Sequence, residues 1–145
     1  MATLKVEVVT PEVALLVGEA KALIARSSDG EFMILPEHTP TVGDIVPGIV
    51  RVDTAEGEVA FAVHGGYFQV GPDETEGQTL ATVLAGVAEK TTDIDVERAL
   101  AAKESAEAAV ASTQVNPDDQ TSNQSARDAL ARAELRLRAA GTRKP

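Results

Sequence analysis

Four charged residues in the C-terminal part of this sequence have a spacing that suits a binding site. Asp95 and Arg98 lie three positions apart at the start of one predicted helix, and Arg132 and Arg136 lie four positions apart on a second. Residues at these spacings are neighbours on a helix surface. If the two helices fold back antiparallel, the three arginines can meet at one end. Guanidinium groups suit phosphate oxygens because they bind them through paired hydrogen bonds.

The same residues have a second interpretation, which the sequence leaves open. Asp95 and Arg98 can form an ordinary surface pair, worth only about 0.2–0.5 kcal/mol, while the other arginines are simply solvated. Residues 123–145 hold six basic and two acidic side chains. Such a basic tail can dock on an acidic surface, bind a small anion or face water, so charge alone does not separate the two interpretations.

The residue patterns needed for catalysis are missing from the sequence. It has two histidines and no cysteine, no glycine-rich phosphate loop with a lysine, and no histidine-rich metal spacing. The carboxylates are scattered as solubilising charge, and no nucleophile stands beside a base. We therefore expect no catalytic residue and no metal site. Residues 1–88 hold 13 acidic and 4 basic side chains, which argues against nucleic acid as a partner.

Length and composition bound the class of protein. The 145 residues, 43% of them hydrophobic, suffice for one compact domain with an appendage. Without cysteines a reducing compartment is the default. No apolar run is longer than that of residues 13–17, which is far shorter than the roughly 20 residues that span a bilayer. Because the N-terminus alternates like a strand and not like a signal peptide, we expect a soluble, cytoplasmic chain.

The first part of the chain has the two-residue period of β-strands. The segment LKVEVV alternates apolar and charged residues and places Leu4, Val6 and Val8 on one face. From residue 49 to residue 73 the pattern predicts two hairpins in succession. A turn rich in Glu and Gly precedes Val59, and the next turns are at Gly65-Gly66 and at residues 71–73. Short strands with turns at this spacing are typical of an antiparallel β-sandwich.

After residue 88 the period becomes that of helices. Thr92 is a suitable N-cap for a first helix, with Asp95 at its third position. The polar stretch 112–125 predicts a loop, and a second helix should run from about Ser125 to Ala140 and stop at Gly141. The predicted apolar stripes are Ala99, Ala102, Ala106 and Ala109 on the first helix, and Ala126, Ala129 or Leu130, Ala133, Leu137 and Ala140 on the second.

Together these patterns predict an α+β fold. An N-terminal antiparallel β-sandwich covers residues 1–88, and a C-terminal two-helix hairpin covers residues 89–145. The hairpin should be weak, since isolated helices of about 12–15 residues are marginal and a buried methyl group contributes only about 0.8 kcal/mol. It must be stabilised by packing against the sandwich or against another protein. Because its position is then worth only a few kcal/mol, it is a natural two-state switch.

Several short motifs in this order resemble the epsilon subunit of bacterial F-type ATP synthase, over nearly the whole chain. The segment at 30–52, GEFMILPEHTPTVGDIVPGIVRV, resembles the family's Leu-Pro-x-His-x-Pro turn followed by a Pro-Gly-x-Val strand. The segment at 63–70, VHGGYFQV, resembles its Gly-Gly-aromatic strand. The segment at 94–99, IDVERA, resembles the Ile/Leu-Asp-x-x-Arg-Ala motif at the start of its first C-terminal helix. Each motif is weak alone, and their order makes the resemblance strong.

The resemblance implies a place on the rotating central stalk. Family members bind the gamma subunit, touch the membrane ring of c subunits with the sandwich, and couple proton flow to ATP synthesis. Their hairpin can extend along gamma towards the alpha and beta subunits and block ATP hydrolysis. The family thus implies a non-catalytic subunit, peripheral to the cytoplasmic side of the bacterial cell membrane, with protons taken as the coupling ion.

The resemblance also implies site residues. In several bacterial members the folded hairpin binds one regulatory ATP, at positions that match Glu89, Ile94, Asp95, Arg98, Ala99, Arg132 and Arg136. Glu89 and Asp95 would repel phosphates and should therefore face base or ribose. Ser105 stands where ATP-binding relatives can have a further arginine, which favours the surface-pair interpretation. Glu31 and His38 match positions near the c-ring and gamma, although His38 beside prolines also suits a structural turn.

Two other classes of function stay open from the residues alone. The chain could be a free ATP-sensing or adaptor module, which would be a soluble monomer that binds ATP without partners. It could also be a hydrolase with paired acidic residues, which would turn over substrate by itself.

Overall fold

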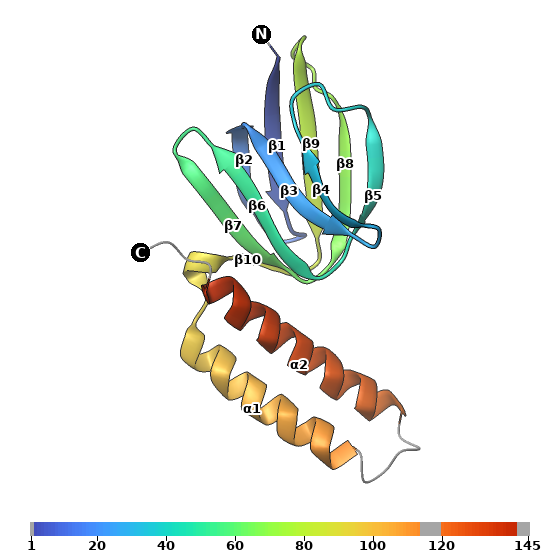
Figure 1. Ribbon diagram of the computed structural model, residues 1–145, viewed down its shortest axis with the longest axis vertical. Helices are drawn as coiled ribbons and strands as arrows, with labels where there is room; N and C mark the ends of the chain where they lie inside the picture. Colours follow the sequence, from blue (N-terminus) through green and yellow to red (C-terminus); the bar gives the residue numbers. More distant parts are fainter. Residues whose placement is uncertain (1, 114–119, 142–145) are drawn as a thin grey trace. The chain divides into compact units, whose positions relative to one another are not determined.

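The protein consists of two compact units, Met1–Lys90 and Thr91–Pro145. The computed structural model describes residues 2–113 and 120–141. The first unit is a sandwich of two five-stranded sheets and the second a pair of helices (Figure 1), so the predicted fold class is confirmed. The strands are β1 Thr3–Val9, β2 Ala14–Ala20, β3 Ala22–Ser27, β4 Gly30–Ile34, β5 Thr41–Ile45, β6 Gly48–Thr54, β7 Gly57–Val63, β8 Gly66–Pro72, β9 Gln78–Ala85 and β10 Ala88–Lys90.

The strand order places the first and the ninth strand side by side. One sheet, sheet A, has the order β2-β1-β9-β8-β5, and the other, sheet B, has the order β10-β7-β6-β3-β4. Every neighbouring pair is antiparallel except β1 with β9, which is parallel from Thr3 opposite Gln78 to Val9 opposite Leu84. Parallel neighbours need a long connection, and here the chain between them builds seven other strands.

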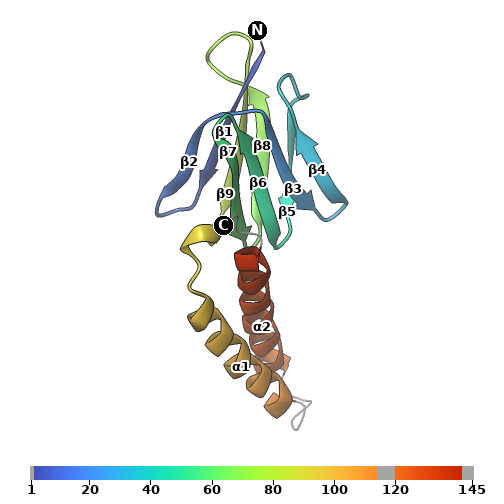
Figure 2. The ribbon, with the colours of Figure 1, turned by 60° about the vertical axis from the view of Figure 1, so that its left-hand side comes forward.

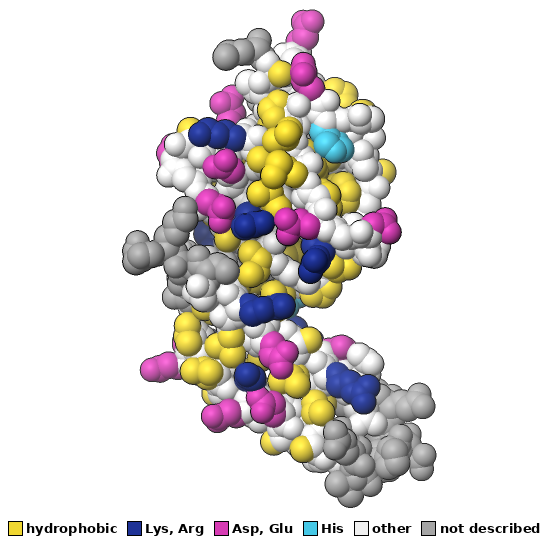
Figure 3. Space-filling view, viewed as in Figure 1, with side chains coloured by type: hydrophobic (Ala, Val, Ile, Leu, Met, Phe, Trp, Pro, Cys, Tyr) yellow, Lys and Arg dark blue, Asp and Glu magenta, His cyan; other side chains and the backbone are white. Residues whose placement is uncertain are grey.

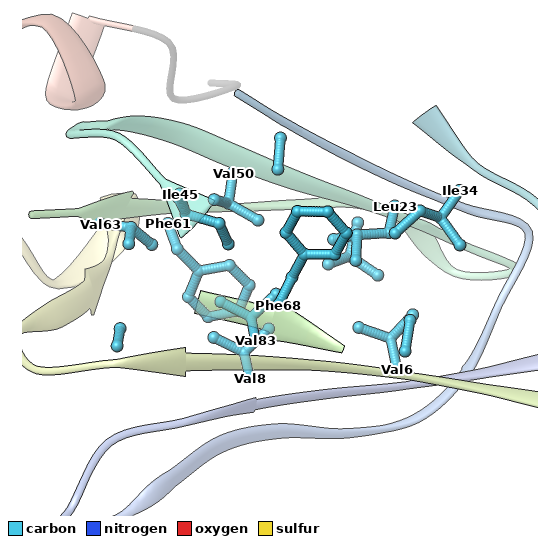
Figure 4. Packing of buried hydrophobic residues seen from close by; sticks show 14 of the residues in the cluster. Val6, Val8, Leu23, Ile34, Ile45, Val50, Phe61, Val63, Phe68 and Val83 are labelled. Atoms are coloured by element: carbon cyan, nitrogen blue, oxygen red, sulfur yellow. The ribbon is translucent and has the colours of Figure 1, made fainter. Parts of the chain in front are cut away.

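The core lies between the two sheets and is made of inward-facing aliphatic residues with two phenylalanines. Leu4, Val6 and Val8 are fully buried on one face of β1, as their alternation predicts. Figure 4 shows Phe61 of β7 and Phe68 of β8 among valines from both sheets. The Phe68 ring also packs on Phe32, with ring centroids 4.4 Å apart, a distance typical of favourable aromatic pairs.

One of the two predicted hairpins is present and the other is wrong. Strands β6 and β7 form a hairpin whose turn is closed by the Thr54 hydroxyl, which donates to the Gly57 carbonyl at 2.7 Å. Strands β7 and β8 lie in different sheets, so the glycines at 65 and 66 carry the chain from one sheet to the other. Periodicity cannot separate these cases, because both need a tight reversal between two alternating segments.

A glycine is required at position 66 because the backbone of β9 passes directly beside it. A Cβ atom there would overlap the carbonyl oxygen of Leu84 and would lie 3.0 Å from the Cα of Ala85. These are backbone atoms of a central strand, so they cannot move aside as a flexible side chain would. Gly66 pairs with Ala85 at the start of β8, where the chain enters sheet A.

The second unit contains a short 3-10 helix, Thr91–Asp93, and two α-helices, α1 Val96–Thr113 and α2 Gln120–Gly141. The predicted loop 112–125 is too long, since helical structure covers both of its ends; residues 114–119 lie outside the described part. Polar residues such as Asn123 and Gln124 continue α2, where the Gln124 amide donates to Asp128 at 2.8 Å. Helix α2 therefore starts five residues earlier than the predicted Ser125.

The predicted apolar stripes are right at some positions and wrong at others. On α1, Ala99 and Ala106 are buried, whereas Ala102 and Ala109 are exposed. On α2, the buried positions are Ala126, Ala133, Leu135 and Ala139. Leu135 is 1% exposed, while the predicted Leu137 is only half-buried. Which of two leucines two positions apart is covered depends on the rotation of the helix, which the neighbouring elements decide.

Gly66→Ala is expected to destabilise the sandwich by about 1–3 kcal/mol, because overpacking against fixed atoms forces the backbone to shift. Gly71→Ala is the matched control in the same strand, since a Cβ there meets nothing within 4 Å. Urea unfolding followed by the fluorescence of Tyr67, the only tyrosine in a chain without tryptophan, reports on this unit. Equal midpoints for the two variants would contradict the proposed clash.

Candidate functional site

Helix α1 begins one residue after Asp95, which is its N-cap. The Asp95 carboxylate accepts a hydrogen bond from the Arg98 N–H at 3.1 Å, and the Asp95 carbonyl accepts one from the Ala99 N–H at 3.0 Å. The predicted cap at Thr92 is therefore wrong, because Thr92 lies inside the 3-10 helix. Aspartate caps helices at least as well as threonine, and its negative charge also interacts favourably with the positive N-terminal end of the helix dipole.

The capping role changes the chemistry open to Asp95. Its carboxylate accepts the N–H of Arg98 at the start of α1, so an anion that bound this N–H would have to displace it. In the described part of the chain no ion pair within 4.0 Å joins Asp95 to the Arg98 guanidinium. The pairing of Asp95 with Arg98 is thus a backbone cap, and the Arg98 side chain is left exposed to solvent.

The three arginines all lie on the helical pair. Helices α1 and α2 pack side by side and run antiparallel (Figures 1 and 2), which brings the first turns of α1 alongside the last turns of α2. Arg98 belongs to the first and Arg136 to the second of these segments, with Arg132 one turn earlier on α2. Arg98 and Arg132 are exposed and Arg136 is half-buried. The three arginines therefore lie at the same end of the helical pair, together with the exposed carboxylates of Glu97 and Glu134.

The remaining nucleotide candidates are positioned differently. Ile94 is 4% exposed and Ala99 fully buried, so both act here as packing residues. Glu89 lies in β10, where it pairs with Ala62 of β7, and so belongs to the sandwich unit. The seven candidates are therefore divided between the two units, with six in the helical one.

The two candidate interface residues lie on β4 and on the turn that follows it. Glu31 is exposed on β4 and forms an ion pair with Arg51 of β6 at 3.6 Å. Both side chains are well exposed, so this pair contributes little to stability. His38 lies in the β4–β5 connection, with its Nδ1 atom 2.8 Å from the Thr39 carbonyl oxygen. This hydrogen bond supports a structural role for His38 in the turn, which does not depend on contact with a partner.

Sequence reasoning missed one buried polar residue near that turn. The hydroxyl of Thr79 in β9 accepts a hydrogen bond from the Glu37 N–H at 2.9 Å, and Thr79 is only 6% exposed. The available signal was a hydroxyl at a strand position whose neighbours on the same face, Ala81 and Val83, are apolar.

The described residues include no group of three or more His, Cys, Asp or Glu side chains placed to hold a metal ion. Within the same residues, neither α-helix is long and apolar enough to cross a membrane.

These features define the class of protein. It is a two-part protein in which a β-sandwich with a full core precedes an alanine-rich helical pair with arginines at one end. Family models match both parts in order. The ATP synthase delta/epsilon chain β-sandwich domain matches residues 3–91, and the long α-helix domain of the same chain matches residues 92–141.

Individual relatives agree with the family models. The ATP synthase epsilon chain of Alkalihalophilus pseudofirmus is 40% identical over 119 residues, which are 82% of this chain and 85% of that one. The ATP synthase epsilon chain of Bordetella parapertussis is 44% identical over 111 residues, or 76% of this chain and 75% of that one. The chain therefore belongs to the ATP synthase delta/epsilon chain family, and its predicted resemblance to the epsilon subunit of bacterial F-type ATP synthase is confirmed.

A solved structure shares the fold. A chain in the mitochondrial ATP synthase of Euglena gracilis, solved with its OSCP, F1 and c-ring, superposes with a TM-score of 0.75 at 23% identity. The match covers 97% of this chain and 82% of the other.

Asp95→Ala is expected to destabilise the helical unit by about 1 kcal/mol, because it removes the N-cap of α1. Asp95→Asn should retain most of the stability, since the amide oxygen can still accept the Arg98 N–H, and Arg98→Ala should change little. Thermal melting by circular dichroism and hydrogen exchange of the Arg98 amide measure the three effects. Similar losses in Asp95→Asn and Arg98→Ala would show instead that a side-chain ion pair holds the helix.

Proposed function

We propose that this chain is a central-stalk subunit of a proton-translocating F-type ATP synthase. The observation that carries the proposal is the match of both family models, in order, to the sandwich and to the helical pair. The sandwich binds the gamma subunit and the c-ring and so helps couple proton flow to ATP synthesis. The helical pair inhibits ATP hydrolysis by engaging the alpha and beta subunits. The subunit has no catalytic residue of its own and lies on the cytoplasmic face of a bacterial cell membrane.

The surface of the sandwich supports a permanent protein partner. Eight large hydrophobic side chains of this unit are about half exposed or more: Val13, Val17, Met33, Leu35, Val42, Tyr67, Leu84 and Val87. Tyr67 and Leu84 are cross-strand partners on the outer face of sheet A. Figure 3 shows hydrophobic side chains between basic and acidic ones on the sandwich surface turned to the viewer. Apolar surface rimmed by charge is typical of protein interfaces.

The packing of the helical pair supports a movable element. Among the residues whose burial is described, α1 buries two alanines, and α2 buries three alanines and one large side chain, Leu135. A buried methyl group contributes about 0.8 kcal/mol, so the interface between the helices is worth only a few kcal/mol. A partner that offers a similar area can then displace one arrangement in favour of another.

Purification of the membranes tests the main proposal. The chain should leave the membrane with the catalytic subcomplex and should stay bound to gamma after that subcomplex is separated. A chain found only in free cytosol, as a monomer that binds ATP without partners, would refute the proposal and establish the free ATP-sensing module instead. Turnover of a substrate by the isolated chain would establish the hydrolase.

Deletion of residues 91–145 in the assembled enzyme is expected to raise ATP hydrolysis several-fold while proton-coupled synthesis continues. Strand β10 ends at Lys90, so the deletion leaves both sheets complete. Hydrolysis and ATP-driven proton pumping by inverted membrane vesicles measure the two activities. A loss of the subunit from the membranes, or an unchanged rate of hydrolysis, would contradict the assigned division of labour between the units.

The second part of the proposal is that the folded hairpin binds one regulatory ATP at the end where its three candidate arginines lie. The guanidinium groups of Arg98, Arg132 and Arg136 hold the phosphates, because three positive charges oppose about four negative ones. The Arg98 N–H takes no part, since it already donates to the Asp95 carboxylate. Asp95 faces base or ribose, and Ile94 and Ala99 support the site by packing. At about ten times its dissociation constant, ATP would stabilise the folded hairpin by about 1.4 kcal/mol.

Arg132→Ala is expected to weaken ATP binding about 10- to 100-fold, because a hydrogen-bonded charge pair contributes about 1.5–3 kcal/mol. Arg127→Ala is the matched control, an exposed arginine on the same helix far from its C-terminal end. Isothermal titration calorimetry of the whole chain measures both. Absence of heat from the wild-type chain would end the ATP proposal and leave the rotor proposal intact, and equal effects of the two variants would contradict the assigned site.

A further inference from the structure

The connection between β4 and β5 contains a residue in an unfavourable backbone conformation. Glu37 has a φ angle of 70°, the left-handed region that residues with a side chain rarely adopt. No other non-glycine residue in the described part of the chain has a positive φ. Such a conformation persists only where surrounding contacts hold it.

The contact comes from β9, on the other side of a long stretch of sequence. The Glu37 N–H donates to the hydroxyl of Thr79 at 2.9 Å, across 42 residues. Thr79 is the second residue of β9, between β1 and β8, where it pairs with Leu4 and Pro72. Because Thr79 is paired with a strand on each side and is only 6% exposed, the position of its hydroxyl is fixed. In Figure 1 the β4–β5 connection passes the end of the sandwich at which β9 begins.

The other hydrogen bonds of this turn join close neighbours in sequence. The His38 N–H donates to the Leu35 carbonyl at 3.1 Å. The Thr39 carbonyl receives the hydroxyl of Thr41 at 2.8 Å and the Nδ1 atom of His38 at 2.8 Å, and because a carbonyl can only accept, Nδ1 carries the hydrogen. These bonds shape the turn internally. The bond to Thr79 connects the shaped turn to the rigid sheet.

We propose that Thr79 is a positioning residue for partner binding. Its hydroxyl holds the turn 35–40 in the single geometry that presents His38 and the half-exposed Leu35 to the rotor. The proposal rests on the proposed function, in which this turn faces the gamma subunit or the c-ring. Thr79 is too buried to touch a partner itself. It acts by removing the loss of conformational freedom that a mobile turn would suffer on binding.

Two substitutions in the full chain separate the hydroxyl from the packing of Thr79. Thr79→Val keeps the shape and loses the hydrogen bond, whereas Thr79→Ser keeps the hydroxyl and loses a methyl group. Thr79→Val should raise the hydrogen-exchange rate of the Glu37 amide about two- to tenfold, as expected for the loss of one hydrogen bond, and Thr79→Ser should restore the wild-type rate. Thr82→Val is the control, because Thr82 points to the opposite face of the same strand.

The same variants are then bound to purified rotor, the gamma subunit with its c-ring. Thr79→Val should weaken binding about two- to tenfold, while Thr79→Ser and Thr82→Val should bind like the wild type. Unchanged exchange of the Glu37 amide in Thr79→Val, or loss of protection in Thr79→Ser with Thr79→Val unaffected, would overturn the proposal. So would wild-type affinity in Thr79→Val despite faster exchange. If the wild-type chain does not bind rotor at all, the proposed function fails, and the positioning role for that partner fails with it. The exchange rate of the Glu37 amide then still decides whether the hydroxyl holds the turn.

Discussion

The parallel pairing of β1 with β9 is the interaction on which the rest of the sandwich depends. The two strands occupy the middle of sheet A although one opens the sequence and the other nearly completes the unit. Strand β9 supplies the hydroxyl that holds Glu37 and the carbonyl that excludes a side chain at Gly66. It also leads within three residues into β10 of the other sheet. A slip of this pair by one residue would turn its buried leucine, valines and alanines towards water, so the register is strongly determined.

The two units differ in how firmly their parts are held, and this difference suits the two tasks proposed for them. The sandwich encloses sixteen buried hydrophobic residues between its sheets, two of them phenylalanines. The helical pair is held mainly by alanines and one leucine. A rigid unit can present the same binding surface to a rotating partner throughout. A unit held by a small interface can change its conformation when a ligand or a partner binds.

In the candidate nucleotide site, the capping contact of Asp95 determines which charged groups are exposed. An aspartate three positions before an arginine can be an ion pair, a cap, or both. In this structure it is a cap, which leaves the guanidinium of Arg98 exposed and available to a ligand. The negative charge of Asp95 also makes the start of α1 a poor place for phosphate. Any anion at this end of the hairpin is therefore held by side chains and not by the helix terminus.

The sequence by itself determined those features that depend on neighbouring residues. The alternation of Leu4, Val6 and Val8 predicted a half-buried strand, because successive side chains of a strand point to opposite faces. The change of period after residue 88 predicted the sandwich and the helical hairpin, and the order of short motifs predicted the family. The three arginines were also correctly expected on the hairpin, since their spacing on each helix is local.

Only the tertiary structure decided which distant segments meet. It showed that the glycines at 65 and 66 join two sheets, that Leu135 and not Leu137 is the buried leucine of α2, and that Thr79 reaches Glu37 across 42 residues. It also showed that the N-cap of α1 is Asp95 and not the predicted Thr92, because a turn of 3-10 helix precedes the α-helix. Periodicity reports the conformation of one segment, whereas pairing, rotation and contact are set by the competition of all segments for the same buried surface.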